Sequence, residues 1–166
     1  MEFAGIEESN YAEVARIYLE GIRTGMATFE TQVPDWQAWN KAHHEFGRIA
    51  LVDQNRMLAW GALTPVSQRY AYRGVAEISV YVAESGRERG LGKAVLQELI
   101  RLAEQNNLWT LQAAIMKQNE VSIAMHKKCG FRVIGYREKV AQLNGIWIDS
   151  VLMERRSKRI GVDQIK

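Results

Sequence analysis

A single glycine-containing loop constrains this chain more than any other segment. The loop, Arg87-Glu88-Arg89-Gly90-Leu91-Gly92-Lys93, follows a strand-like run over 77–82 and precedes an amphipathic helical pattern over 91–106. Glycine allows a tight turn and a close approach of the backbone to a ligand, and the first amide hydrogens of a helix have no intrahelical partner. Because the helix dipole also favours negative charge there, the segment predicts a binding site for phosphate groups.

Two familiar phosphate loops do not fit this segment. A nucleoside-triphosphate loop needs glycine where Arg87 stands and a hydroxyl residue where Ala94 stands. A dinucleotide-binding fingerprint needs a third glycine, but Val95 occupies that position. The remaining pattern is Arg-x-x-Gly-x-Gly after a strand, and on its own it is equally compatible with a solvated turn that begins a helix.

The size of the chain predicts a single domain, 1–166. A chain of 166 residues that is 47% hydrophobic suits one core that buries about 70% of the unfolded surface. The 22 basic and 19 acidic residues give a net charge of +3, which is too weak and too scattered to indicate nucleic-acid binding. Basic residues from Arg155 onward predict a flexible tail over 155–166.

The ends and the cysteine content suggest a cytoplasmic protein. The N-terminus lacks a signal-like region, and no apolar run approaches the roughly 20 residues that span a bilayer, so we expect no membrane partner. The single cysteine, Cys129, excludes an internal disulfide, and its place at the end of a helical pattern favours a packing role over a nucleophilic one. His43 and His44 would point about 100° apart on a helix, so we expect no metal site.

Periodicity and turn signals predict an α+β fold with a mixed sheet. Asn10 and Asp35 are placed to cap helices, Gly130 to end one, and Asn144-Gly145 to form a tight hairpin. The expected strands cover 3–6, 48–52, 57–64, 75–82, 108–115, 131–143 and 146–154, and the expected helices cover 11–23, 36–46, 91–106 and 120–128.

A second motif lies downstream of the loop. Asn119 begins the segment Asn-Glu-Val-Ser-Ile-Ala-Met-His-Lys-Lys-Cys-Gly-Phe, which ends at Phe131 and contains His126. With the loop, this segment resembles the GNAT superfamily of N-acetyltransferases. Without that resemblance, Asn119 is a helix cap and His126 an exposed helix histidine.

The resemblance extends over nearly the whole chain and narrows to the phosphinothricin and methionine-sulfoximine acetyltransferases. It depends on Ala27-Thr28-Phe29-Glu30-Thr31, on Tyr72-Arg73-Gly74-Val75-Ala76-Glu77 before Ser79-Val80-Tyr81-Val82, on the His126 motif, and on Gly145-Ile146-Trp147-Ile148-Asp149. Val140-Ala141 and Gln142-Leu143 depart from the branch pattern, which leaves the acceptor open.

The resemblance implies a GNAT-like, mixed and mostly antiparallel sheet of about seven strands with about four flanking helices. It also implies a homodimer that uses acetyl-CoA. The pyrophosphate would bind backbone amides from Glu88 to Lys93 and the side chains of Arg87 or Arg89, while the pantetheine arm would pair with the strand. The implied cofactor-binding residues are Val80, Tyr81, Val82, Arg87, Glu88, Arg89, Gly90, Leu91, Gly92, Lys93 and Asn119.

The resemblance also implies catalytic roles for two residues. Glu77 would act as the base that takes the amine proton through water, although the residues alone equally allow a charge at the solvent end of a strand. His126 stands where the superfamily more often has a tyrosine acid, and would protonate the thiolate or relay a proton.

The acceptor is expected to be a small amino-acid-like amine of the phosphinothricin, methionine sulfoximine or methionine sulfone type. Arg69 and Arg73 would grip its acidic groups, unless they are surface arginines, with Phe29, Glu30 and Ser79 beside it. Trp147 and Asp149 would complete the pocket or a dimer contact. The alternatives are a protein N-terminal or lysine acetyltransferase and a non-catalytic acyl-CoA sensor.

Overall fold

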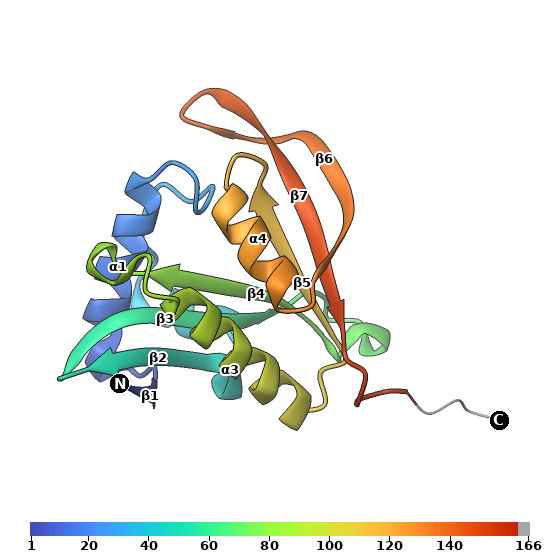
Figure 1. Ribbon diagram of the computed structural model, residues 1–166, viewed down its shortest axis with the longest axis horizontal. Coiled ribbons are helices and arrows are strands. Elements are labelled where there is room, and N and C mark those ends of the chain that lie inside the picture. The colour runs from blue at the N-terminus through green and yellow to red at the C-terminus, as the bar shows by residue number, and fades with distance from the viewer. Residues whose placement is uncertain (163–166) are drawn as a thin grey trace.

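The computed structural model describes residues 1–162 and consists of one seven-stranded sheet with helices on both faces (Figure 1). The strands are β1 (Glu2–Gly5), β2 (Arg48–Asp53), β3 (Arg56–Pro65), β4 (Val75–Val82), β5 (Thr110–Met116), β6 (Arg132–Leu143) and β7 (Ile146–Arg156). The α-helices are α1 (Tyr11–Arg23), α2 (Trp36–Ala42), α3 (Leu91–Gln105) and α4 (Glu120–Lys128). The expected α+β class and element order are therefore confirmed.

The sheet has the order β1-β2-β3-β4-β5-β7-β6, and β4–β5 is its one parallel pair in the described chain. These two strands pair only from Val75 opposite Thr110 to Glu77 opposite Gln112. Both continue beyond that point, β4 to Val82 and β5 to Met116, without pairing to each other. The sheet therefore opens between its two central strands, and Figure 1 shows them leaving a shared end in different directions.

Two cores hold the helices against the sheet. Helix α3 places Val95, Leu96 and Leu99 in a core shared with β2, β4 and β5, and α4 packs against the same core. On the other face, Val14 and Ile17 of α1 pack with residues of α2 and β3. The alternation of β4 therefore directs its even-numbered side chains toward α3 and its odd-numbered ones toward α1.

The expected turns form where their residues allow them. Asn144 and Gly145 have φ of 50° and 80°, the left-handed conformations of a tight hairpin, and Gly130 ends α4 with φ of 87°. Asp35 caps α2 by accepting a hydrogen bond from the Ala38 amide at 2.8 Å. Asn10 instead stabilises the turn before α1, accepting from the Glu7 amide at 2.9 Å, so its expected capping role is corrected.

Helix α2 is shorter than expected, ending at Ala42 rather than near Phe46. His43 turns its ring back, and Nδ1 lies 2.6 Å from the Trp39 carbonyl oxygen. The His44 amide then donates to the carbonyl of Leu63 on β3 at 2.9 Å, which draws the backbone out of the helix. A separate 3-10 turn, Glu45–Gly47, leads into β2.

The first residues of the basic C-terminal segment are part of the sheet and its contacts. Arg155 and Arg156 belong to β7, and Ser157 is buried, donating to a carboxylate oxygen of Glu104 at 2.9 Å. Arg155 contacts the same carboxylate at 3.1 Å. Residues 155–157 therefore belong to the fold, the flexibility of the segment after them stays a prediction, and residues 163–166 lie outside the described chain.

Candidate active site

The opening between β4 and β5 forms a cleft of ≈ 90 Å³. Its walls are the diverging parts of the two strands, the first turns of α4, and two residues of the loop after α1. The cleft-lining residues are Met26, Ala27, Glu77, Ile78, Ser79, Val80, Tyr81, Ala113, Ala114, Ile115, Met116, Asn119, Ser122 and His126. A narrow cleft flanked by unpaired strand backbone can bind an extended chain by completing the ladder.

The glycine loop lies beside the end of β4. Glu88 and Gly90 have φ of 62° and 74°, so the turn that begins α3 needs the left-handed conformation that glycine adopts freely. A Cβ atom on Gly92 would stand 3.0 Å from Met125 Sδ and 3.2 Å from Val82 Cγ2. Gly92 therefore lets α3 approach α4 and β4, and its expected approach to a ligand stays a prediction.

The loop offers both backbone and side-chain groups for an anion. The side chains of Arg87, Arg89 and Lys93 are exposed, whereas Leu91 is buried. Leu91 and Gly92 can thus contribute their amides alone, which belong to the unpaired first turn of α3. The arrangement is suited to a pyrophosphate.

Glu77 lies at the closed end of the cleft, in the last residue pair that joins β4 to β5. Glu77 is an exposed residue that lines the open cleft, and the protein on its other sides displaces part of the water around it. This desolvation raises the pKa of the carboxyl above its ordinary value of 4.5, while the charge of Arg137 opposes part of the rise. A carboxylate with a raised pKa is a stronger base than a fully solvated one.

His126 is buried at 4% exposure beside the same cleft, contrary to an exposed helix position. Its Nδ1 lies 2.8 Å from the Ser122 carbonyl oxygen, which can only accept, so Nδ1 carries the hydrogen and Nε2 is the acceptor. Burial lowers the pKa of the imidazole below 6.5, and the bond to Ser122 opposes this. A neutral ring in this tautomer favours proton relay over direct protonation of a thiolate.

Asn119 joins the start of α4 to the loop after α1. Its Oδ1 accepts from the Ser122 amide at 3.2 Å, which confirms the helix cap, and its Nδ2 donates to the Met26 carbonyl at 3.2 Å. The cap thus also fixes one wall of the cleft.

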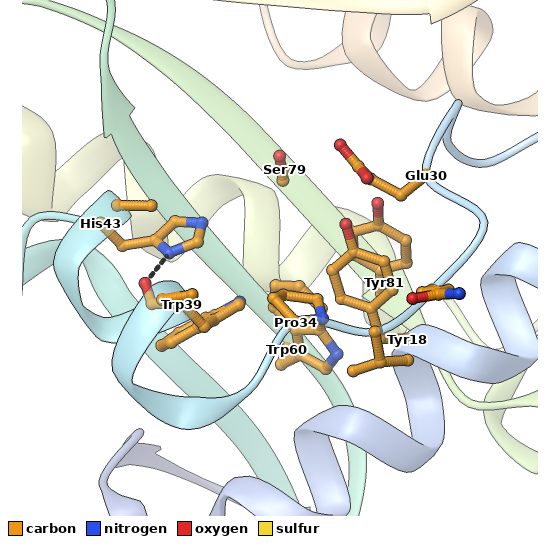
Figure 2. A pocket seen from close by; sticks show the side chains of 12 residues that line it. Tyr18, Glu30, Pro34, Trp39, His43, Trp60, Ser79 and Tyr81 are labelled. Carbon is orange, nitrogen blue, oxygen red and sulfur yellow. Dashed lines mark hydrogen bonds between the residues drawn. The ribbon is translucent and has the colours of Figure 1, made fainter.

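A larger cavity of ≈ 380 Å³ lies on the α1 side of the sheet and shares Ser79 and Tyr81 with the cleft (Figure 2). Its lining residues are Tyr18, Glu30, Gln32, Val33, Pro34, Ala38, Trp39, Ala42, His43, Trp60, Ser79 and Tyr81. The expected acceptor residues Glu30 and Ser79 are among them. Sequence reasoning missed Tyr18, Trp39, His43 and Trp60, because aromatic residues in helical or strand patterns are typical of a core.

The two expected arginines line neither cavity. Arg73 stacks on the rings of Tyr70 and Trp109, at 4.0 and 5.1 Å from their centroids, and donates to the Tyr70 carbonyl at 3.0 Å. Arg69 lies over the ring of Tyr72 at 5.3 Å. The arginines therefore do not join Glu77 in lining the cleft, and they contact Tyr70 and Tyr72 of their own loop and Trp109 before β5.

The remaining expected residues have simpler surroundings. Phe29 is half-buried and lines neither cavity. Trp147 is 55% exposed. Asp149 accepts a hydrogen bond from the Lys139 amide at 2.8 Å and holds the irregular part of β6, rather than completing a pocket. Cys129 is partly buried against the α3 core, which agrees with a packing role.

The fold and the cleft together define an acetyltransferase. Residues 31–152 match the family model described as an acetyltransferase (GNAT) domain, which is more than half of the chain. The chain belongs to this family.

Two relatives of this chain within the family are named for their acceptors. An L-methionine sulfoximine/L-methionine sulfone acetyltransferase of Pseudomonas paraeruginosa is 34% identical over 71% of this chain and 70% of its own. A phosphinothricin N-acetyltransferase of Alcaligenes faecalis is 31% identical over 90% of this chain and 79% of its own.

Solved structures confirm the fold. A phosphinothricin acetyltransferase from Sinorhizobium meliloti, in complex with AcCoA, superposes with a TM-score of 0.88 at 23% identity, covering 99% of this chain and 92% of that one. No helix within residues 1–162 is long and apolar enough to cross a membrane. The same residues contain no group of three His, Cys, Asp or Glu side chains arranged to hold a metal ion.

Proposed function

We propose that this protein transfers an acetyl group from acetyl-CoA to the amino group of a small amino-acid-like acceptor, of the methionine sulfoximine, methionine sulfone or phosphinothricin type. The observation that carries the proposal is the cleft between β4 and β5, with a carboxylate at its closed end and the glycine loop beside the end of β4. The names of the relatives support the acceptor class.

The cleft and the loop account for the binding of acetyl-CoA. Amides from Glu88 to Lys93 and the exposed Arg87 and Arg89 would hold the pyrophosphate, since charge-assisted contacts to phosphate are strong. The backbone of β4 from Ile78 to Val82 has no β5 partner and would pair with the pantetheine arm. Asn119 holds the cleft wall beside it.

Glu77 would receive the proton that the attacking amine must lose. Bound acetyl-CoA supplies a thioester, and the new carbon–nitrogen bond replaces its carbon–sulfur bond. An ammonium has no free electron pair, so its proton must first pass through water to a base. Glu77 has the location and the raised pKa for this task. The departing thiolate then needs a proton, which His126 would relay from water through the free Nε2 side of its ring.

We further propose a cytoplasmic homodimer. The hairpin formed by β6 and β7 exposes Tyr136, Ile146 and Trp147 at 70%, 64% and 55%. Exposed large apolar side chains are a feature of protein interfaces when they form one patch, and these three belong to one hairpin. Sedimentation velocity of wild-type protein and of Trp147→Lys would test this, with a shift toward monomer expected for the variant.

The acetyltransferase proposal is tested by release of free CoA thiol from acetyl-CoA. The acceptor panel comprises methionine sulfoximine, methionine sulfone, phosphinothricin, common amino acids, polyamines and a peptide with a free N-terminus. Turnover with a free amino acid or small amine supports the proposal. A peptide that outcompetes every small amine would support a protein acetyltransferase, and binding of acetyl-CoA without any turnover would support an acyl-CoA sensor.

A further inference from the structure

The larger cavity has one formal charge in its wall, and that charge is negative. Among the lining residues, all within 1–162, Glu30 is the acidic one and none is lysine or arginine. Burial lowers the pKa of the His43 imidazole below 6.5, so His43 adds no positive charge at neutral pH. Arg48 does not line the cavity, and its guanidinium donates to Asn40 and lies 3.9 Å from Glu45. An anion that enters the cavity therefore meets a like charge without a balancing cation in the wall.

The polar groups at one end of this cavity can both donate and accept hydrogen bonds. Figure 2 shows the Glu30 carboxylate beside the hydroxyl groups of Tyr18 and Tyr81, with Ser79 nearby. Desolvation raises the pKa of both phenols, and the charge of Glu30 adds to the rise. The phenols are therefore neutral near pH 7 and keep a hydrogen that they can donate. The charge of Glu30 thus acts at this end of the cavity.

Aromatic and small apolar residues form the other walls. The rings of Tyr18, Trp60 and Tyr81 stack on one another with centroids 4.5 to 5.6 Å apart, so neighbouring rings cover much of their faces. Ring edges carry the positive part of the quadrupole, which suits the oxygen atoms of an uncharged ligand. The small apolar residues of the wall are Val33, Pro34, Ala38 and Ala42. A methyl group can pack against this part of the cavity.

The three acceptor types of the proposed function differ in one terminal group. Methionine sulfone ends in a neutral sulfonyl methyl group, whose two oxygen atoms accept hydrogen bonds. Methionine sulfoximine has nearly the same shape and is also neutral, and its terminal N–H can donate. Phosphinothricin ends in a methyl phosphinate of similar shape that carries a negative charge. Beside Glu30 the phosphinate would lose water next to a like charge, whereas the neutral groups would exchange water for hydrogen bonds.

We propose that the larger cavity receives the terminal group of the acceptor and favours a neutral sulfone or sulfoximine over an anionic phosphinate, with Glu30 as the discriminating residue. The inference rests on the proposed function and ranks the acceptors within it. The hydroxyl groups of Tyr18, Tyr81 and Ser79 donate to the terminal oxygen atoms. Glu30 accepts from the N–H of a sulfoximine and repels a phosphinate.

The spacing along β4 agrees with the length of these acceptors. Glu77, at the closed end of the cleft, and Ser79, shared by both cavities, lie two residues apart on one face of β4, a separation of about 7 Å. Four bonds separate the amine nitrogen of methionine sulfone from its sulfur, a reach of about 5 Å when extended. An amine that contacts Glu77 through one water therefore places the terminal group beside Ser79, where the larger cavity begins.

Methionine sulfone and phosphinothricin provide the test, because they share the amine, the carboxylate and the carbon chain and differ in the charge of the terminal group. Wild-type kcat/KM, measured by thiol release, should be higher for the sulfone. In Glu30→Gln the sulfone-to-phosphinothricin ratio should fall roughly two- to fivefold, which is the scale of one interaction with an exposed charge. Glu30→Asp keeps the charge and should retain most of the preference.

The ratio cancels any effect of a substitution on acetyl-CoA or on the groups that both acceptors share. Glu8→Gln removes the same charge from an exposed residue that lines neither cavity, and it should leave the ratio unchanged. This variant separates the local effect of Glu30 from a change in the net charge of the protein.

Calorimetric titration of both acceptors in the presence of coenzyme A gives a readout without turnover. Methionine sulfone should bind more tightly than phosphinothricin to the wild type, and Glu30→Gln should narrow the difference. Ala38→Leu fills part of the cavity from an exposed position on α2, and it should weaken the binding of both acceptors.

A ratio that is unchanged in Glu30→Gln, or a wild-type preference for phosphinothricin, would overturn the inference. Unchanged affinities in a folded Ala38→Leu variant would also overturn it, because the terminal group would then lie elsewhere. Failure of the proposed function has a different signature, namely no thiol release with any acceptor in the panel. In that case the titration still decides, because a preference for the sulfone that depends on Glu30 supports the inference, and the absence of binding or of preference rules it out.

Discussion

At the scale of single residues, Glu77 combines three properties that a base for acetyl transfer needs. It lies where the two central strands separate, its carboxyl opens into the cleft, and desolvation raises its pKa. The raised pKa has a cost, because the charged form is disfavoured in the folded protein. The raised pKa that suits Glu77 to act as a base therefore also lowers the stability of the folded protein.

Glu77→Gln should lower kcat by roughly 10² to 10⁴ and leave the Kd of acetyl-CoA nearly unchanged, because the amide keeps the shape but cannot accept a proton. In the wild type, kcat should rise with pH through a pKa above 4.5, and the variant should lose this dependence. A pH profile of thiol release measures both effects.

Thermal denaturation supplies the control for Glu77. A carboxyl with a raised pKa holds more protons when folded than when unfolded, so its contribution to stability falls as pH rises above 4.5. Glu77→Gln should therefore melt at the same or a higher temperature at neutral pH. If Glu77→Gln is folded and has wild-type turnover, Glu77 is not the base.

Arg73→Lys tests whether an arginine outside both cavities holds the acceptor. If Arg73 binds an α-carboxylate, lysine loses the bidentate geometry. The apparent binding free energy of an amino acid should then weaken by about 1 to 3 kcal/mol, and its KM should rise accordingly. KM for acetyl-CoA should stay constant. A loss of melting temperature with unchanged KM would show that Arg73 only packs on Tyr70 and Trp109.

At the scale of elements, the start of α3 depends on one backbone conformation. Gly90 has φ of 74°, and no atom lies within 4 Å of the position that a Cβ would take there. Gly145 in the β6–β7 turn has φ of 80° and equally open space. Alanine at either position should cost about 1 kcal/mol of stability through left-handed strain alone. Gly145→Ala is therefore a control for Gly90→Ala, because both substitutions introduce the same backbone strain.

Gly90→Ala should weaken acetyl-CoA binding beyond this shared strain, because its methyl group lies where the ligand approaches the amides of α3. Gly145→Ala should lose similar stability and keep wild-type affinity. Calorimetric titration of both variants makes the comparison. Equal affinities in the two variants would place the pyrophosphate elsewhere.

Local signals explain which elements could be predicted from the sequence. The Asp35 cap, the Gly130 helix end and the Asn144-Gly145 turn each act within a few residues, so their patterns are visible in the chain. The end of α2 could not be predicted in this way, because it depends on the hydrogen bond between His44 and Leu63 on β3. Contacts between distant segments leave no periodic signal.

The same distinction applies to the site. The loop, Glu77, Asn119 and His126 could be selected from motifs, whereas the aromatic cavity could not, because α1, α2, β3 and β4 each contribute separate residues to it. The two arginines are the converse case, and their acceptor role stays a prediction. Their sequence neighbourhood suggested the acceptor, but Tyr70, Tyr72 and Trp109 lie within reach of their guanidinium groups.

At the scale of the whole molecule, the three histidines give the fold a shared pH dependence. Burial lowers the pKa values of His43, His44 and His126 below 6.5. A lowered pKa means that the unfolded chain binds more protons, so the stability from each residue is present above pH 6.5 and is lost as pH falls. The effects add because all three have the same sign.

The melting temperature should therefore fall between about pH 7 and about pH 5, a range in which histidines titrate and most carboxylates stay charged. His126→Gln should flatten this slope, because it removes one of the buried imidazoles. Differential scanning calorimetry across this range measures the effect. A melting temperature independent of pH would contradict the buried neutral state of these rings.

The separation of β4 and β5 leaves backbone groups of the central strand without a β5 partner after Glu77. In an unliganded molecule, the amides there exchange with solvent hydrogen through small local openings. An extended ligand that pairs with β4 would occupy this opening, so hydrogen exchange should slow at those amides from Ile78 to Val82 that face the cleft and not β3, with β2 and β3 little affected. At a ligand concentration of about 100 times Kd, the folded state gains about 2.7 kcal/mol. The enzyme would thus be most resistant to unfolding when its co-substrate is abundant.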